Sequence, residues 1–161
     1  MLIGILSDTH GRTSAVRRAL ALFDTLGVQH VIHCGDVGGM GVLEELVGRP
    51  CTLVWGNVDL PDAATLAFLH AVGLPAPTDV PTIIELDGRR IAVWHGHEPG
   101  FHDGACGPDL DYVFHGHTHQ RQDVRWGRTR IINPGALHRA HVRTVATLDL
   151  RTDELTFHQL E

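Results

Sequence analysis

Short apolar runs alternate with amphipathic stretches along the first half of the chain. Residues 2–6, 28–33 and 52–55 are apolar runs typical of buried strands. The segments that follow them place apolar side chains at helical spacing, and the third of these segments covers residues 64–71. The order strand, helix, strand, helix, strand predicts parallel strands joined by right-handed crossovers.

The second half of the chain has a different pattern, which predicts mostly antiparallel β-structure. Asp87-Gly88 is a strong hairpin turn signal between two apolar runs. Together the runs predict strands and hairpins at residues 82–94, 112–114, 124–132 and 142–160. The whole chain therefore reads as an α/β protein.

Composition and charge narrow the class of protein. The chain has 161 residues, 43% hydrophobic and 20% charged, which predicts one globular domain over residues 1–161. A formal net charge of −6 disfavours tight binding to nucleic acid polymers or to an anionic membrane. No apolar run approaches the ~18 residues of a membrane span. The oligomeric state is left open, and a homo-oligomer is among the states allowed.

The number and spacing of the cysteines indicate a reducing compartment. Cys34, Cys51 and Cys106 are odd in number and have no paired spacing. Such cysteines are expected to be reduced thiols, which predicts a cytoplasmic protein.

Polar side chains follow five of the predicted strands, at the point where each strand ends. In chain order they are Asp8 and His10, then Asp36, Asn57, His95, and finally His117 and His119. If these strand ends converge, they gather two carboxylates, one amide and four imidazoles in one pocket. Two divalent ions ~3.5–4 Å apart in such a pocket would clamp a phosphate and activate a bridging hydroxide for in-line attack.

Six short motifs occur in a fixed order over residues 2–150. They are Asp8-Thr9-His10, Gly35-Asp36, Gly56-Asn57-Val58-Asp59, His95-Gly96-His97, Gly116-His117-Thr118-His119 and Asn133-Pro134-Gly135. As a set they resemble the calcineurin-like metallophosphoesterase superfamily. The small size of the chain is similar to the single-domain bacterial and archaeal phosphodiesterase branch of that superfamily.

The resemblance implies a fold, an activity and a ligand set. The fold would be two packed mixed β-sheets flanked by helices, a four-layer αββα sandwich. The activity would be metal-dependent hydrolysis of small phosphate esters, specifically phosphodiesters. The cofactor would be two divalent ions, manganese first, with iron, nickel or zinc as alternatives. Asp8, His10 and His119 would bind one ion, Asn57, His95 and His117 the other, and Asp36 both.

The sequence departs from the family pattern at one position that matters for catalysis. Many members have a histidine after the asparagine that helps to protonate the leaving group, and here that residue is Val58. His97 either replaces it as the general acid or orients the neighbouring His95. The predicted catalytic set is therefore Asp36, Asn57 and His97.

Three residues are predicted to contact the substrate. They are His97, His102 and Asn133. The alternative for His102 is an exposed loop histidine with no role. The alternative for Asn133 is a simple turn at a strand end.

A second class of function is a non-catalytic scaffold that binds metal or another protein. A eukaryotic vacuolar-sorting relative shares the family fold, works in protein assembly and lacks part of the ligand set. In this chain all seven ligand positions are filled, which favours the enzyme. Taken singly, each ligand could equally be a capping or turn residue.

Overall fold

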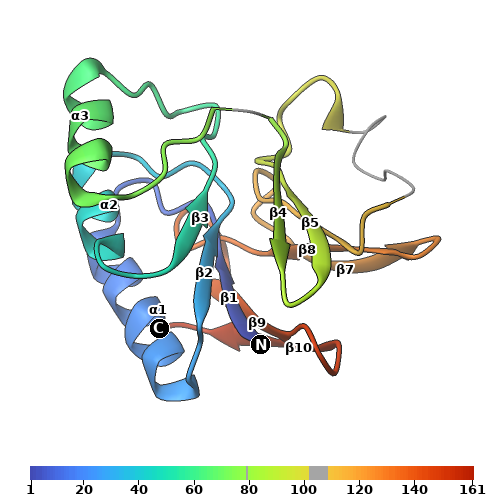
Figure 1. Ribbon diagram of the computed structural model, residues 1–161. Coiled ribbons are helices and arrows are strands. Elements are labelled where there is room, and N and C mark those ends of the chain that lie inside the picture. The colour runs from blue at the N-terminus through green and yellow to red at the C-terminus, as the bar shows by residue number, and fades with distance from the viewer. Residues whose placement is uncertain (79, 102–108) are drawn as a thin grey trace.

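The computed structural model describes residues 1–78, 80–101 and 109–161, and these form two β-sheets packed face to face (Figure 1). The first sheet has the order β10-β9-β1-β2-β3 and the second β4-β5-β6-β8-β7. The strands of the first sheet are β1 (Leu2–Leu6), β2 (His30–His33), β3 (Cys51–Leu53), β9 (Thr144–Asp149) and β10 (Glu154–Gln159). Those of the second are β4 (Thr82–Leu86), β5 (Arg89–Val93), β6 (Tyr112–Phe114), β7 (Arg121–Trp126) and β8 (Thr129–Pro134).

Three helices lie on the outer side of the first sheet (Figure 1). They are α1 (Thr13–Leu26), α2 (Met40–Leu46) and α3 (Ala63–Val72). The side chain of Asp62 caps α3 by accepting from the backbone N–H of Thr65, and α1 ends at Gly27 in the left-handed conformation. Within the described residues, none of the helices combines the length and the apolar character needed to cross a membrane.

The core between the sheets is built from strand residues of both. Ile3, Ile5 and Ile32 of the first sheet belong to one buried cluster with Val93 and Phe114 of the second. A separate cluster fills the space between the first sheet and the helices. Cys34 and Cys51 are free and buried, and Cys106 lies outside the described residues.

The predicted order of elements in the first half is confirmed. Strand β1 pairs with β2, and β2 with β3, in parallel register. The prediction of two mixed sheets with flanking helices is also confirmed. The described helices all cover the first sheet, whereas the outer face of the second sheet carries a small apolar cluster that includes Trp94, Phe101 and Leu110.

The prediction of a mostly antiparallel second half is wrong for the middle of the second sheet. Strand β6 pairs in parallel with both β5 and β8, and only the outer strands β4 and β7 are antiparallel. Hairpins are visible in a sequence because their turn residues are local. The partners of β6 are reached through longer connections, which carry no such signal.

This topology brings the ends of strands from both sheets together. Strand β1 ends next to β2, and Asp8 N–H donates to the carbonyl of Gly35 at 3.0 Å. Strands β5 and β6 end side by side, and Gly116 N–H donates to the carbonyl of His95 at 2.9 Å. The N–H of His117 crosses to the first sheet and donates to Asp8 Oδ2 at 3.1 Å.

Candidate metal centre

The backbone at these strand ends holds an unusual conformation. Five of the seven predicted ligands have φ between 43° and 66°: Asp8, His10, Asp36, His117 and His119. A positive φ is uncommon outside glycine, and such strain typically costs about 1–3 kcal/mol per residue. It persists where the surrounding structure fixes it, and such residues cluster at functional sites.

Four of the predicted ligands form a first group around one point. Nε2 of His10 lies 3.4 Å from Nε2 of His119 and 3.5 Å from Oδ2 of Asp36. The ligand atoms of these residues and of Asp8 all lie within 4.8 Å of one another. Imidazole nitrogens and carboxylate oxygens gathered in this way suit a divalent cation.

The buried carboxylate of Asp8 tests whether a cation fits the first group. The side chain has no exposed surface, and Oδ2 accepts from the N–H of His117. Oδ1 lies 3.1 Å from His119 Nε2 but accepts no hydrogen bond from any described group. A buried carboxylate oxygen without a hydrogen bond is costly, and a bound cation would satisfy it. The first group therefore fits a metal ion.

The remaining three predicted ligands form a second group on the other side of Asp36. Asn57 Oδ1 lies 3.2 Å from His95 Nε2 and 3.1 Å from His117 Nδ1. His95 Nε2 lies 3.3 Å from Asp36 Oδ1. All seven side chains predicted from the sequence are thus brought together.

Asp36 lies between the two groups and is held in its ionised form. Its Oδ2 faces His10, while its Oδ1 faces His95 and accepts from the N–H of Val58 at 3.2 Å. Burial acts to raise the pKa of this carboxyl, but the hydrogen bond and charge of His95 and the Val58 N–H outweigh it and hold the pKa at about 2.

Two of the histidines are oriented by backbone carbonyl groups. His95 Nδ1 lies 2.7 Å from the carbonyl oxygen of Cys34, and His119 Nδ1 lies 3.4 Å from that of Arg139. A carbonyl oxygen can only accept, so each Nδ1 carries the proton. In the neutral form of each ring, Nε2 then presents a lone pair to its group, which is the arrangement that metal-binding histidines commonly have. In its protonated form, His95 instead donates from Nε2 to Asp36.

Two glycines leave the space that the carboxylates occupy. A Cβ on Gly116 would collide with Oγ of Ser7 and would lie 2.6 Å from Oδ2 of Asp8. A Cβ on Gly56 would collide with Oδ1 and the backbone nitrogen of Asp36. Neither position can therefore carry a side chain without displacing a carboxylate of the site.

Two acidic residues, Asp59 and Glu98, stabilise the loops that carry the predicted ligands, a role that the motifs did not indicate. Asp59 accepts from the N–H groups of Val37, Gly38 and Gly56 at 2.8–3.0 Å. Glu98 accepts from the N–H groups of His95 and Gly96 at 3.0 and 2.6 Å. Their signal in the sequence is an acidic residue two or three positions after a ligand in a glycine-containing turn.

His97 lies at the rim of the second group. Its ring centroid is 5.3 Å from that of His95 and 6.1 Å from that of His117, and its side chain is 34% exposed. The carbonyl of Cys34 already orients the ring of His95. His97 is therefore not needed for that role, which was the alternative to its action as a general acid. Val58, the residue that departs from the family pattern, is exposed beside the same group.

The predicted substrate contact of Asn133 is not supported by its position. The side chain has no exposed surface. Its Nδ2 donates to the carbonyl of Gly116 at 2.7 Å and to Oγ1 of Thr118 at 3.1 Å, while its Oδ1 accepts from the N–H of Gly135. Asn133 therefore fixes the turn that carries His117 and His119. The other predicted contact, His102, lies outside the described residues.

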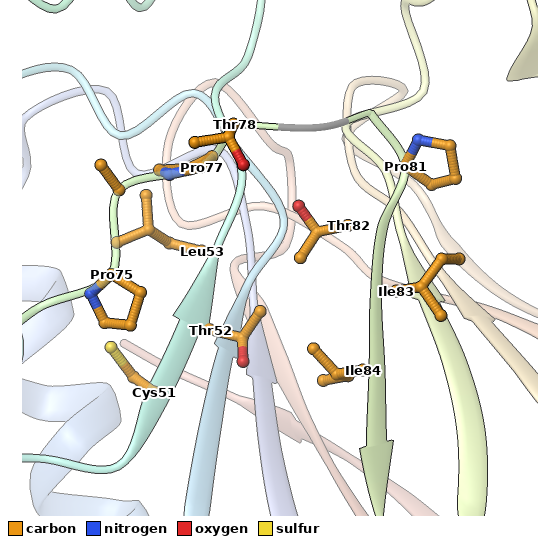
Figure 2. Close-up of a pocket in the computed structure, with 11 residues that line it drawn as sticks. Cys51, Thr52, Leu53, Pro75, Pro77, Thr78, Pro81, Thr82, Ile83 and Ile84 are labelled. Carbon is orange, nitrogen blue, oxygen red and sulfur yellow. The ribbon is translucent and has the colours of Figure 1, made fainter.

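A cavity of about 470 Å³ lies between the edge strands β3 and β4 (Figure 2). Thr52 and Leu53 line one side, and Ile83 and Ile84 the other. None of the described ligand candidates lines this cavity, so it is separate from the candidate metal centre.

The fold and the site together define a class: a two-sheet α/β sandwich that presents a cation-binding cluster at its strand ends. The family model of the calcineurin-like phosphoesterase superfamily domain matches residues 1–153. The chain therefore belongs to the calcineurin-like phosphoesterase superfamily, as its motifs predict. Family and cluster together point to divalent metal ions as cofactors.

Known proteins of this family resemble the chain over nearly its full length. A phosphodiesterase of Methanocaldococcus jannaschii is 30% identical over 159 residues, which cover 96% of each chain. A solved structure of an archaeal phosphodiesterase is 28% identical with a TM-score of 0.89, covering 99% of this chain and 100% of that one.

Only the fold is shared with a more distant solved structure. Vps29 of Entamoeba histolytica in complex with zinc is 22% identical with a TM-score of 0.69, covering 99% of this chain and 91% of that one.

Proposed function

We propose that this chain is a phosphodiesterase that works with two divalent metal ions on small phosphate esters. The observation that carries the proposal is the position of Asp36, whose two carboxylate oxygens face different groups of ligands. Oδ2 lies 3.5 Å from His10 Nε2, and Oδ1 lies 3.3 Å from His95 Nε2. One carboxylate placed in this way can serve two cations at once.

Each cation site would draw on three further residues. Asp8, His10 and His119 would hold one ion, and Asn57, His95 and His117 the other. When bound there, divalent ions act as Lewis acids on a phosphate ester and provide a nucleophile from water at neutral pH. The nitrogen and oxygen donors, with no thiolate, suit manganese, iron, nickel or zinc, and we propose manganese.

The protein's own residues would orient the reaction. The low pKa of Asp36, about 2, keeps its carboxylate charged at neutral pH. The Cys34 and Arg139 carbonyls hold two imidazoles with their Nε2 atoms facing inward. His97, half-exposed at the rim, is placed to donate a proton to the leaving oxygen of a substrate.

The comparisons support phosphodiesters as the substrate class, because the similar curated protein and the similar solved archaeal structure are each described as a phosphodiesterase. We also propose that the chain acts as a single domain in a reducing compartment such as the cytoplasm. Buried free thiols at Cys34 and Cys51 agree with that compartment.

Metal removal and replacement test the proposal. We expect a chelator to abolish hydrolysis of bis-p-nitrophenyl phosphate and manganese to restore it. Asp36→Ala and His117→Ala should each lower turnover by about 10³-fold, which corresponds to ~4 kcal/mol of lost transition-state stabilisation. His70→Ala, on the exposed side of α3, is the matched control and should retain turnover.

Wild-type turnover in the Asp36 or His117 variants would contradict the mechanism. Mass spectrometry of protein purified without added metal separates the enzyme from a scaffold. Two ions per chain support the proposal, whereas less than one ion per chain without hydrolysis supports a scaffold.

A further inference from the structure

A second hollow adjoins the candidate metal centre on the side of the first ligand group. Its volume is about 450 Å³, within the range of small-molecule sites. His119 lines it together with two arginines, Arg121 at the start of β7 and Arg139 in the loop before β9. His141 lines it as well. The lining of the hollow therefore includes a predicted metal ligand and two positively charged side chains.

The positive charge extends beyond the lining. Arg12 donates from Nε to Nδ1 of His138 at 3.3 Å, and the ring of His138 lies 5.5 Å from that of His10. Burial lowers the pKa of His138, and the nearby charges of Arg12, Arg139 and Arg143 lower it further. We call the four arginines Arg12, Arg121, Arg139 and Arg143 the arginine rim.

No residue of the arginine rim forms an ion pair with a carboxylate in the described parts of the chain. Most arginines elsewhere do, for example Arg17 with Glu45, Arg49 with Asp24, and Arg130 with Asp123. The exceptions among the described residues are Arg18 and Arg151. Acidic residues are in excess in this chain of net charge −6, yet these four arginines beside one site have no carboxylate partner among the described residues. Arg121 has one aromatic contact, with its guanidinium 5.7 Å from the centre of the Phe157 ring. A guanidinium offers a planar fork of donors that matches a phosphate.

We propose that the arginine rim and its hollow bind a second phosphate group of the substrate, next to the phosphodiester that is cleaved. This inference rests on the proposed phosphodiesterase activity and narrows its substrates to small phosphodiesters that carry a further phosphate. Arg139 and Arg121 would bind that phosphate from two sides. Divalent ions bound at the neighbouring centre would add to the positive electrostatic potential at the arginine rim. They would also neutralise the carboxylates of the centre, which then could not offset the charge of the rim.

A matched pair of chromogenic substrates tests the inference. The pair is thymidine 5′-(p-nitrophenyl phosphate) with and without a 3′-phosphate. We expect kcat/KM to be about 10- to 100-fold higher with the 3′-phosphate, because charge-assisted hydrogen bonds to arginine are lost without it. In Arg139→Met this preference should fall towards one, and Arg139→Lys should keep part of it because the charge remains.

Binding is measured separately from turnover. Calorimetry on the manganese-loaded protein should show thymidine 3′,5′-bisphosphate binding about 10- to 100-fold more tightly than thymidine 5′-monophosphate. The difference should shrink in Arg139→Met and in Arg121→Met. Arg151→Met is the control, because Arg151 lies in the turn between β9 and β10, beside the opposite end of β1.

The outcomes separate the two proposals. Equal kcat/KM for both substrates, unchanged in Arg139→Met, overturns the second-phosphate site and leaves the phosphodiesterase intact. Tight, Arg139-dependent binding of the bisphosphate without any hydrolysis supports the site and overturns the phosphodiesterase. Binding of a single-stranded oligothymidylate more than about 10-fold tighter than the bisphosphate overturns the assignment to a small molecule.

Discussion

The candidate ligands are side chains whose other polar atoms already have partners. Oδ2 of Asp8 accepts from the His117 N–H, and Nδ1 of His95 donates to a carbonyl. The atoms that remain, Oδ1 of Asp8 and Nε2 of His95, face the two groups. A residue held at one atom presents its other atom in a fixed direction, and such preorganisation gives a metal site its geometry.

A prediction at this scale concerns proton donation by His97. In His97→Gln we expect kcat for thymidylyl-(3′→5′)-thymidine, whose leaving group is an alkoxide, to fall by about 10²–10⁴-fold. Hydrolysis of bis-p-nitrophenyl phosphate should change little, because p-nitrophenolate leaves without a proton. Steady-state kinetics on both substrates measure the contrast.

The control for this prediction is His70→Gln, on the exposed side of α3. An equal loss on both substrates in His97→Gln would mean that His97 acts on the metal centre rather than on the leaving group.

At the scale of elements, the loops after β2 and β3 are held together by one carboxylate. Asp59 follows β3, and it accepts from Val37 and Gly38 in the loop after β2 and from Gly56 in its own loop. These loops carry Asp36, which faces both ligand groups, and Asn57, which belongs to the second group. Their relative position is therefore set by Asp59 as much as by the strands.

Asp59→Asn tests this role. The variant keeps the size of the side chain but loses its charge and one acceptor oxygen. We expect the free energy of unfolding to fall by about 1–3 kcal/mol and manganese affinity to fall about 10- to 100-fold. Denaturant unfolding and metal titration measure the two effects.

Asp62→Ala provides the comparison for Asp59→Asn. It removes the cap of α3 and should lower stability by about 1 kcal/mol without weakening metal binding. If Asp59→Asn loses stability but binds manganese as tightly as wild type, Asp59 supports the fold and not the centre.

At the scale of the whole molecule, the two sheets are joined by a charged cluster as well as by their apolar core. Arg130 on β8 donates through Nε and Nη2 to both oxygens of Asp123 on β7, at 2.8 and 2.9 Å. Its Nη1 donates to Asp153, in the turn between β9 and β10, at 2.6 Å. Tyr112 on β6 donates to the same carboxylate at 3.0 Å.

This cluster predicts a pH dependence of stability. The hydrogen bond from Arg130 is the main cause that lowers the pKa of Asp123. Burial acts to raise the pKa of Asp153, but the hydrogen bonds from Arg130 and Tyr112 and the charges of Arg130 and Arg125 together outweigh it and lower this pKa. A carboxyl group whose pKa is lower in the folded state stabilises the fold above its unfolded pKa, near 4, and this contribution is lost as the pH falls through the folded pKa.

The variant Arg130→Met tests that dependence. We expect it to be less stable than wild type at pH 7, with a difference that narrows between pH 5 and pH 2. Urea unfolding across this range measures the difference, with the exposed Arg18→Met as the control. A difference that stays constant with pH would show that packing of the Arg130 side chain, and not its ion pairs, links the sheets.

Much of the fold was readable from local patterns. The Asp87-Gly88 turn joins β4 and β5 as predicted, and the parallel order of β1, β2 and β3 follows from alternating apolar runs and helical spacing. The cap of α1 has no such local signal, because Arg12 occupies the N-cap position and makes no side-chain cap.

The sequence by itself determined which polar residues lie at the strand ends, because apolar runs mark the strands and the polar residues after them are read directly. The tertiary structure alone decided how these residues are divided between the two ligand groups. His10 and His119, 109 positions apart, share one group, and Asp36 faces both groups. It also decided that Asn133 is buried and that the arginine rim borders the site. Contacts across two sheets depend on the register of strands distant in the chain, and no local pattern encodes that register.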